Sequence, residues 1–205
     1  QLSIDRLREK YSSKISGDAA DFERYLETIN RQIKDIENLV NEFSNFARMP
    51  RPIFIKININ DLIEKSVELL NLTMKNKINI LSTDKNLLIN GDPGQLNRVF
   101  INLIKNSQEA FLDLNQKNPD FKGIIDIEII SNNDYIVIKL TDNGTGISNT
   151  KKAMTPYFTT KTKGTGLGLP IVSKIINEHS GEFLIENNID GNGINIEISL
   201  PKINA

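Results

Sequence analysis

Two prolines in the stretch MPRP, residues 49–52, divide the chain into two parts with different sequence patterns. Proline fits poorly in a helix interior, because it lacks the N–H that the helix needs and its ring clashes with the preceding turn. A helical pattern therefore has to end here. The 205 residues are enough for one good core and an additional helical element.

The part before the break, residues 1–48, predicts a helical hairpin. In its second helix, apolar residues alternate steps of four and three, the heptad pattern of helices that pack side by side. These heptad residues are Phe22, Leu26, Ile29, Ile33, Ile36, Val40 and Phe43. The first helix is shorter, so we expect the hairpin to bury its apolar face in a bundle with a second copy of the chain. A hairpin packed against the rest of the same chain is the alternative.

The part after the break, residues 53–205, mixes strand and helix patterns, with several strands adjacent in sequence. We therefore expect an α+β fold, a two-layer α/β sandwich rather than a doubly wound parallel sheet. Strand patterns occur at 53–59, 78–82, 87–90, 124–130, 135–141, 182–187 and 193–200. A polar, glycine-containing segment is expected over 142–167, and a helix over about 168–179.

Two further helices are expected from their start signals. Asn60 or Asp61 is the candidate N-cap of a helix that contains Leu62 and Leu70. The stronger signal is GDPGQ, residues 91–95, in which an aspartate N-cap precedes a proline at the first helical position. The glutamine of this stretch, Gln95, predicts a capping box.

Composition excludes several classes of protein. The 25 Lys and Arg nearly balance the 26 Asp and Glu, so no basic field indicates nucleic acid as a partner. The chain has no cysteine and a single histidine, His179, which excludes disulfides, thiolate metal sites and histidine-rich metal sites. No apolar run is long enough to span a bilayer. Because the sequence starts at Gln1 without a signal peptide, we expect a piece of a longer protein.

The stretch PYFTTKTKGTGLGLPIV, residues 156–172, brings three glycines together directly before a helical pattern. A P-loop is excluded, since no glycine in this chain is followed by lysine. A dinucleotide fingerprint requires Gly or Ala at position 169, which is Leu169. The P-loop is therefore eliminated, and the dinucleotide-binding loop is a poor fit.

A second glycine motif, DNGTGI at residues 142–147, follows a strand pattern. Asp142 can accept a hydrogen bond from an exocyclic amine such as N6 of adenine. Gly144 and Gly146 allow the backbone to lie close to a flat ring, because they have no Cβ. Taken alone, the same residues are also typical of an ordinary turn.

Two asparagines, Asn102 and Asn106, lie four residues apart on one face of the helix that begins near residue 93. Asparagine is not favoured in the middle of a helix, so the pair requires a reason. An amide oxygen is a suitable ligand for Mg²⁺. Hydrogen bonding between the helix and a loop is the alternative.

The motifs NLIKN, DNGTGI, PYFTTK and GTGLGL occur in this order, on the expected helix, strand end, loop and helix start. Together they resemble the N, G1, F and G2 boxes of the ATP-binding catalytic domain of sensor histidine kinases. The resemblance covers residues 51–201 and is most similar to the nitrogen-regulation branch, the NtrY and NtrB type. It implies a Bergerat-type ATP-binding fold over 53–205, a linker at 49–52, and a truncated dimerisation and histidine-phosphotransfer hairpin at 1–48.

The resemblance also implies roles for individual residues. Asp142 would recognise adenine, with Gly144 and Gly146 lining the base pocket. Asn106 would bind Mg²⁺, and Asn102 would lie beside it near the phosphates.

The glycine stretch would form the hinge of a mobile lid over 148–165 and the start of a helix whose N–H groups suit phosphate. The hinge and helix-start residues are Gly164, Thr165, Gly166, Leu167 and Gly168. Lys161 is a candidate phosphate contact, or else a solvated loop lysine.

The implied activity is transfer of the γ-phosphate of ATP to a histidine, for relay to an aspartate of a response regulator. The acceptor is expected upstream of Gln1, because His179 follows the lid and is interpreted as a capping or packing residue. The gyrase and MutL ATPases have Glu one turn before the metal-binding Asn. Here that position is Asn102, which cannot act as a base, and this favours a kinase over an ATPase. An ATP-binding dimerisation module without turnover is the other alternative.

The partners implied are a second copy of the chain and the receiver domain of a cognate response regulator, with no nucleic acid. The resemblance places this part of the protein in the cytoplasm. It is compatible with a full-length protein that is an inner-membrane sensor.

Overall fold

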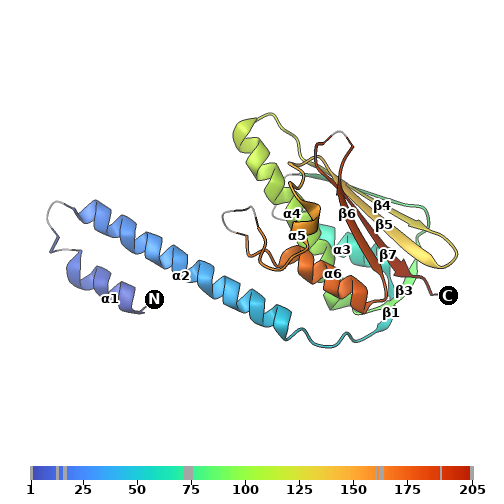
Figure 1. The fold of residues 1–205 in the computed structure, drawn as a ribbon, viewed down its shortest axis with the longest axis horizontal. Helices are drawn as coiled ribbons and strands as arrows, with labels where there is room; N and C mark the ends of the chain where they lie inside the picture. The colour runs from blue at the N-terminus through green and yellow to red at the C-terminus, as the bar shows by residue number, and fades with distance from the viewer. Residues whose placement is uncertain are drawn as a thin grey trace. The chain divides into compact units, whose positions relative to one another are not determined.

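The computed structural model describes residues 2–12, 14–15, 18–71, 76–159, 161, 164–189 and 191–203 (Figure 1). The chain divides into two compact units. The first contains residues 1–49 and 161–165, and the second contains residues 50–160 and 166–205. In the described residues, no helix is long and apolar enough to cross a membrane.

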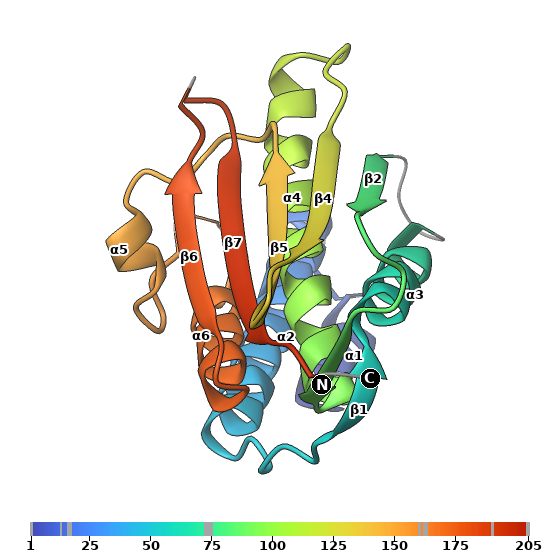
Figure 2. The ribbon, with the colours of Figure 1, turned by 90° about the vertical axis from the view of Figure 1, so that its right-hand side faces the viewer.

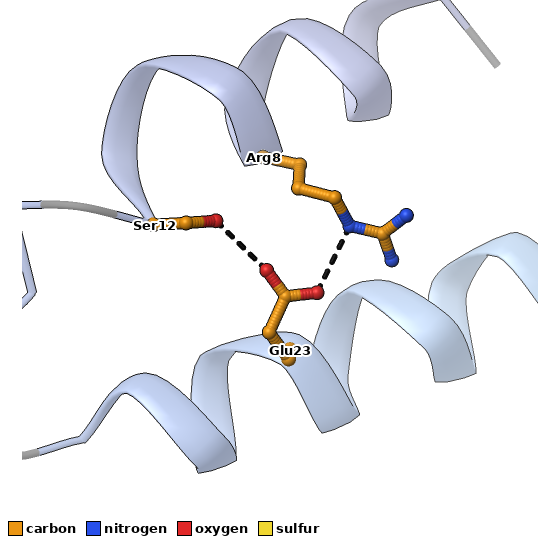
Figure 3. A network of polar contacts seen from close by, with 3 residues as sticks. All are labelled: Arg8, Ser12 and Glu23. Carbon is orange, nitrogen blue, oxygen red and sulfur yellow. Dashed lines mark hydrogen bonds and ion pairs between the residues drawn. The ribbon is translucent and has the colours of Figure 1, made fainter.

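The helices of the first unit are α1 (Leu2–Tyr11) and α2 (Ala19–Ala47), which are unequal in length, as the sequence predicted. Glu23 of α2 joins them (Figure 3). One oxygen of its carboxylate accepts a hydrogen bond from Arg8 Nε at 2.9 Å, and the other accepts one from Ser12 Oγ at 2.8 Å. Both partners come from α1 and the residue after it. These contacts hold the N-terminal part of α2 against α1.

The heptad residues of α2 differ in burial along the helix. Leu26 is buried, whereas Ile29, Ile36 and Val40 are exposed. Phe43, near the end of the pattern, is also exposed. The helix therefore carries an exposed apolar stripe over most of its length.

The second unit is built on a five-stranded sheet with the strand order β2-β4-β5-β7-β6. Its strands are β2 (Lys77–Ser82), β4 (Ile124–Ser131), β5 (Tyr135–Asp142), β6 (Glu182–Asn187) and β7 (Ile194–Pro201). Strand β2 pairs with β4 in parallel, and the other pairs are antiparallel. A separate antiparallel pair is formed by β1 (Ile55–Asn58) and β3 (Leu88–Gly91).

Three helices form the second layer, on one face of the sheet (Figure 2). They are α3 (Ile59–Asn71), α4 (Pro93–Lys117) and α6 (Gly168–Glu178). The core between the layers contains alternate strand residues such as Ile127 and Ile138, together with Phe100 and Leu103 of α4. On the open face, alternation brings polar residues to the surface, including an ion pair between Lys139 and Glu197 at 3.7 Å. The predicted α+β two-layer sandwich is confirmed.

The N-cap of α4 is Asp92, as predicted, but the capping box is wrong. One carboxylate oxygen of Asp92 accepts hydrogen bonds from the N–H groups of Gly94 and Gln95. The side chain of Gln95 does not return to the Asp92 N–H; it donates to the carbonyl oxygen of Pro50 at 2.9 Å. The Asp92 N–H instead donates to His179 Nε2 at 2.9 Å. The Asp92 N–H is thus satisfied by a residue distant in sequence, His179, and not by the nearby Gln95 side chain.

The start of α3 also differs from the prediction. The helix begins at Ile59, and Asn58 supplies the cap by accepting the N–H of Asn60 at 3.0 Å. Asn60 lies inside the helix, nearly buried, and donates to the carbonyl oxygen of Asp84. The predicted cap at Asn60 or Asp61 is therefore wrong: asparagine suits an N-cap, and here the neighbouring Asn58 fills that role.

Candidate functional site

The carboxylate of Asp142 lies at the end of β5 and is 4% exposed. Its Oδ1 accepts the N–H groups of Gly144 at 2.9 Å and Ile194 at 3.2 Å. Its Oδ2 accepts the hydroxyl of Ser107, on α4. A buried carboxylate is costly unless it is hydrogen-bonded, and these donors from three elements satisfy that requirement and fix its orientation.

Close packing at Gly144 and the backbone conformation at Gly146 both favour glycine after Asp142. A Cβ on Gly144 would lie 2.9 Å from the Cβ of Ala110 on α4, so this turn packs directly on the helix. Gly146 has φ of +70°, a conformation that L side chains rarely adopt. At Gly144 the backbone of the DNGTGI motif therefore lies against α4 without a side chain in between.

Asn106 lies beside the start of α6. A Cβ on Gly168 would be 3.7 Å from Asn106 Nδ2 and 3.9 Å from Asn106 Oδ1, so this amide faces the glycine at the helix start. The N-cap of α6, Leu167, provides no side-chain hydrogen bond to the first turn. Asn102 is half-buried one turn earlier on α4. The NLIKN and GTGLGL motifs thus meet at Asn106 and Gly168.

The motifs PYFTTK and GTGLGL are also joined. Gly166 has φ of +69°, and its carbonyl oxygen accepts the N–H of Tyr157 at 3.1 Å. A Cβ on Gly166 would lie between 2.6 and 2.8 Å from backbone atoms of Tyr157 and Phe158. Only glycine fits this close approach of two backbones. Phe158 thus meets the GTGLGL motif through its backbone.

Between these motifs, the polar segment expected over 142–167 includes a helical element. It contains a short helix, α5 (Thr150–Ala153), whose N-cap Asn149 accepts the N–H of Lys152 at 2.9 Å. Of the lid residues, Lys161, Gly164 and Thr165 belong to the first unit, where the Gly164 N–H donates to the Lys161 carbonyl at 3.3 Å. Their predicted contact with phosphate stays a prediction.

The neighbouring Thr160, Thr162 and Lys163 of the same stretch lie outside the described residues.

The interpretation of His179 as a capping and packing residue is confirmed. It is 5% exposed, and Nε2 accepts the Asp92 N–H. Nδ1 lies 2.8 Å from the carbonyl oxygen of Ile175. Because that carbonyl can only accept, Nδ1 carries the proton and both ring nitrogens are engaged.

Several residues around Asp142 were missed by sequence reasoning. Ser107 follows Asn106 directly and is a polar residue at a core position of α4, which could have drawn attention to it. Asn188 donates to the Asp142 carbonyl oxygen at 2.8 Å, and Gly193 is so close to Asp142 that any Cβ would overlap its carbonyl. Both lie in a stretch of Asn and Gly residues that predicts only a turn between two strands.

Comparisons with known proteins agree with this arrangement. Residues 91–204 match the family of histidine kinase-, DNA gyrase B-, and HSP90-like ATPases. The nitrogen regulation protein NtrY of Azorhizobium caulinodans is 33% identical over 204 residues, which is 98% of this chain and 26% of that protein. An NtrY-like sensor histidine kinase of Rickettsia prowazekii is 35% identical over 206 residues, 98% of this chain and 33% of that protein. The chain therefore spans only a quarter to a third of the length of these curated relatives.

Solved structures give the same result for the fold. A nucleotide-free catalytic domain of the histidine kinase ThkA has a TM-score of 0.63 and 29% identity, covering 73% of this chain and 96% of that one. The histidine kinase ThkA in complex with the response regulator TrrA has a TM-score of 0.70, covering 98% of this chain and 57% of that one. At 24% identity, this second likeness shows the fold alone.

Proposed function

Because the chain belongs to the family of histidine kinase-, DNA gyrase B- and HSP90-like ATPases and forms the ATP-binding catalytic core of a sensor histidine kinase, we propose that it transfers the γ-phosphate of ATP to a histidine outside residues 1–205. The acceptor must lie elsewhere, since His179 is buried with both ring nitrogens engaged. The phosphate then passes to an aspartate in the receiver domain of a response regulator.

The observation that carries this proposal is the pattern of hydrogen bonds that the Asp142 carboxylate accepts. Two backbone N–H groups occupy Oδ1, whereas Oδ2 accepts the Ser107 hydroxyl and retains capacity for a further donor. An exocyclic amine is such a donor, and adenine presents one at N6. Gly144 and Gly146, which let this loop pack closely on Ala110 and Asn187, would line the base with their backbone. We propose that these residues bind the adenine base.

The phosphates are proposed to lie where Asn106 meets the start of α6. A helix N-terminus attracts anions, because its first N–H groups have no partner within the helix. Gly164, Thr165, Gly166, Leu167 and Gly168 are the proposed phosphate-side residues, with Lys161 as a point charge from the lid and Asn102 nearby on α4. Closing of the lid would exclude water from the γ-phosphate.

Asn106 is the proposed protein ligand of Mg²⁺. Among the described residues, no three His, Cys, Asp or Glu side chains gather as a metal site. Mg²⁺ in nucleotide sites usually has few protein ligands, and phosphate oxygens and water complete its shell. A single amide oxygen beside an anion-binding helix start fits that donor set. When bound, the ion neutralises charge that develops on the phosphates.

In the transfer, a histidine nitrogen forms a bond to the γ-phosphorus as the bond to the β,γ-bridging oxygen breaks, and ADP leaves. The chain contributes positioning and electrostatic stabilisation to this step. Hydrolysis would require a base to activate water, and Asn102 cannot take a proton. We therefore favour phosphotransfer over ATP hydrolysis.

We propose that residues 1–48 are the end of the dimerisation and phosphotransfer domain, residues 49–52 a linker, and residues 53–205 the catalytic domain. The exposed stripe on α2, including Ile29, Ile36 and Val40, supports a homodimer, since helices with such a face bury it in bundles. A cytoplasmic location of this part, in a full-length protein that is anchored in the membrane, follows from the same assignment.

The experiment that tests the function supplies the acceptor separately. The chain is incubated with Mg²⁺ and ATP labelled at the γ-phosphate, together with an isolated helix pair that carries the acceptor histidine. Acid-labile label on the acceptor histidine is expected. Nucleotide binding without transfer would instead identify an ATP-binding dimerisation module. Release of labelled phosphate without acceptor labelling would identify an ATPase.

A further inference from the structure

The DNGTGI motif, residues 142–147, crosses over the start of β7 to reach β6. It leaves β5 at Asp142, and the sheet order puts β7 between β5 and β6. Gly193, just before β7, lies under the crossing: its Cβ would be 1.9 Å from the Asp142 carbonyl oxygen. On the far side the motif ends at Ile147, which meets Asn187, the last residue of β6. One loop therefore spans three strand ends.

Asn187 binds the far end of this loop through both the oxygen and the nitrogen of its side-chain amide. Its Oδ1 accepts the N–H of Ile147 at 2.7 Å, and its Nδ2 donates to the Ile147 carbonyl oxygen at 2.8 Å. The pair reproduces what a neighbouring strand would provide to one residue. Aspartate could not supply both bonds, because its carboxylate has no donor for the Ile147 carbonyl oxygen.

Asn188 fastens the near end. Its Nδ2 donates to the carbonyl oxygens of Asp142 at 2.8 Å and Asn192 at 2.7 Å. The first bond ties the backbone of Asp142 to the turn between β6 and β7, and the second closes that turn. The carboxylate of Asp142 is meanwhile held by Ser107, on α4. Backbone and side chain of Asp142 are thus fixed by different elements.

Gly146 lies between the two fastened ends in a left-handed conformation, φ +70°. A Cβ there would be 3.0 Å from Asn187 Oδ1 and 3.4 Å from the Gly193 carbonyl oxygen. A side chain at this position would therefore press on Asn187, and glycine suits a turn whose next residue Asn187 holds.

We propose that Asn187 is a positioning residue for nucleotide binding, which acts by holding the 142–147 loop in the shape that receives adenine. Asn188 holds the same loop at Asp142. The inference rests on the proposed function, because it says which residues hold the loop of the proposed base pocket in place. Neither asparagine touches the base; each acts through the backbone that does.

The test compares Asn187→Ala with Asn132→Ala as a matched control. Asn132 is also an exposed turn asparagine with two side-chain bonds to backbone, from the N–H groups of Asp134 and Tyr135. It lies before the other end of β5, away from Asp142. Binding of ADP and GDP to each folded variant is measured by calorimetric titration.

We expect Asn187→Ala to weaken ADP binding about five- to tenfold, the effect of losing roughly one hydrogen-bonded contact. GDP binding should change less, so the preference for ADP should fall, whereas Asn132→Ala should bind both as the parent does. Hydrogen exchange at the Ile147 amide should become faster in Asn187→Ala alone. A merely stabilising residue would leave the ADP to GDP ratio unaltered.

Unchanged ADP affinity in Asn187→Ala, or an equal loss in Asn132→Ala, would overturn the inference. If Asn187→Ala does not fold, Asn187→Asp takes its place, since it keeps the acceptor for the Ile147 N–H and loses only the donor. Weaker ADP binding by that variant is expected, and unchanged binding would again overturn the inference. Failure of the parent itself to bind ADP would count against the proposed function instead.

Discussion

The imidazole of His179 accepts the backbone N–H of Asp92 at 2.9 Å, and so the end of α6 is tied to the beginning of α4. The carboxylate of Asp92 accepts the N–H of Ile53 at 2.8 Å, which brings the chain after the MPRP break to the same point. The ring of Phe54 packs edge-on against His179, with 5.0 Å between ring centres. The entry of the chain into the second unit is thus held by one capping residue and one histidine.

Ionised Asp92 should contribute to the free energy of unfolding, and this contribution should be lost at acid pH. Burial alone raises the pKa of Asp92, but hydrogen bonds from three backbone N–H groups outweigh it and hold this pKa below its ordinary value of 3.8. A lowered folded-state pKa stabilises the fold above the unfolded value, and this contribution is lost as the pH falls through the folded-state pKa. Urea unfolding of the parent and of Asp92→Asn should therefore differ at about pH 7 and converge at strongly acid pH. A constant difference between them would contradict this origin.

Asp142→Asn should weaken ATP binding and reduce the preference for ATP over GTP. The amide has only one acceptor oxygen, and its NH₂ group would face either backbone donors or the Ser107 hydroxyl. A loss of about tenfold or more in ATP affinity is expected. Asp126→Asn, on the exposed face of β4, is the control for the change of charge. Equal ATP binding by Asp142→Asn and the parent would refute the adenine assignment.

Asn106→Ala should abolish the dependence of ATP binding on Mg²⁺. In the parent, Mg²⁺ is expected to raise ATP affinity, because the ion connects the amide oxygen to the phosphates. In the variant, titrations with Mg²⁺ and with a chelator should give the same affinity. Lys105→Ala, a change at an exposed neighbour on α4, should keep the dependence. If Asn106→Ala retained it too, another ligand would have to hold the metal.

Gly193→Ala should be far more damaging than Gly191→Ala. Both glycines have positive φ, +83° and +77°, so both substitutions carry backbone strain of order 1 kcal/mol. Only at Gly193 would the new Cβ collide with the Asp142 carbonyl, whereas nothing lies within 4 Å at Gly191. We expect Gly193→Ala to lower the free energy of unfolding by several kcal/mol and to impair ADP binding. Thermal unfolding of the two variants measures the difference, and similar melting temperatures would be inconsistent with the crossing loop.

Replacing Ile33 and Ile36 with Glu should give monomers that still bind ATP. Ile36 lies in the exposed stripe of α2, and burial of such surface favours association by about 25 cal/mol per Å² before entropy costs. Sedimentation should show a dimer for the parent and a monomer for the double variant. Leu184→Glu, an exposed apolar residue on β6, controls for added charge and should leave the dimer intact. A monomeric parent at high concentration would exclude association through α2.

The elements of the fold could be predicted from the sequence wherever a local pattern decides them. The strand expected at 182–187 has those bounds in the structure, since the burial of its residues alternates along the strand. Pairing could not be predicted. Nothing in the residues of β2 indicates that it lies parallel to β4, or that β1 and β3 form a sheet of their own. Strand partners are chosen by tertiary packing, which leaves no periodic signal.

The candidate site also contains residues that the sequence identifies and residues that it does not. Motif residues such as Asp142, Asn106 and Gly166 stand out in the sequence by residue type and spacing, and their roles in nucleotide binding stay predictions. Ser107, Asn187 and Asn188 could not be identified, because they act on the backbone or carboxylate of a residue distant in sequence. Sequence reasoning gave His179 a capping or packing role but could not name its partner, because Asp92 lies 87 residues away.

Strand β7, the last of the sheet in sequence order, lies between β5 and β6, so the sheet is continuous only once β7 has been added. Its first residue, Ile194, donates to Asp142 Oδ1, and Gly193 supports the crossing loop. During synthesis, the nascent chain would consequently be unable to bind nucleotide until these residues have left the ribosome. ATP would then stabilise only chains that already contain β7, and a chain that terminates before Ile194 would be left for proteases.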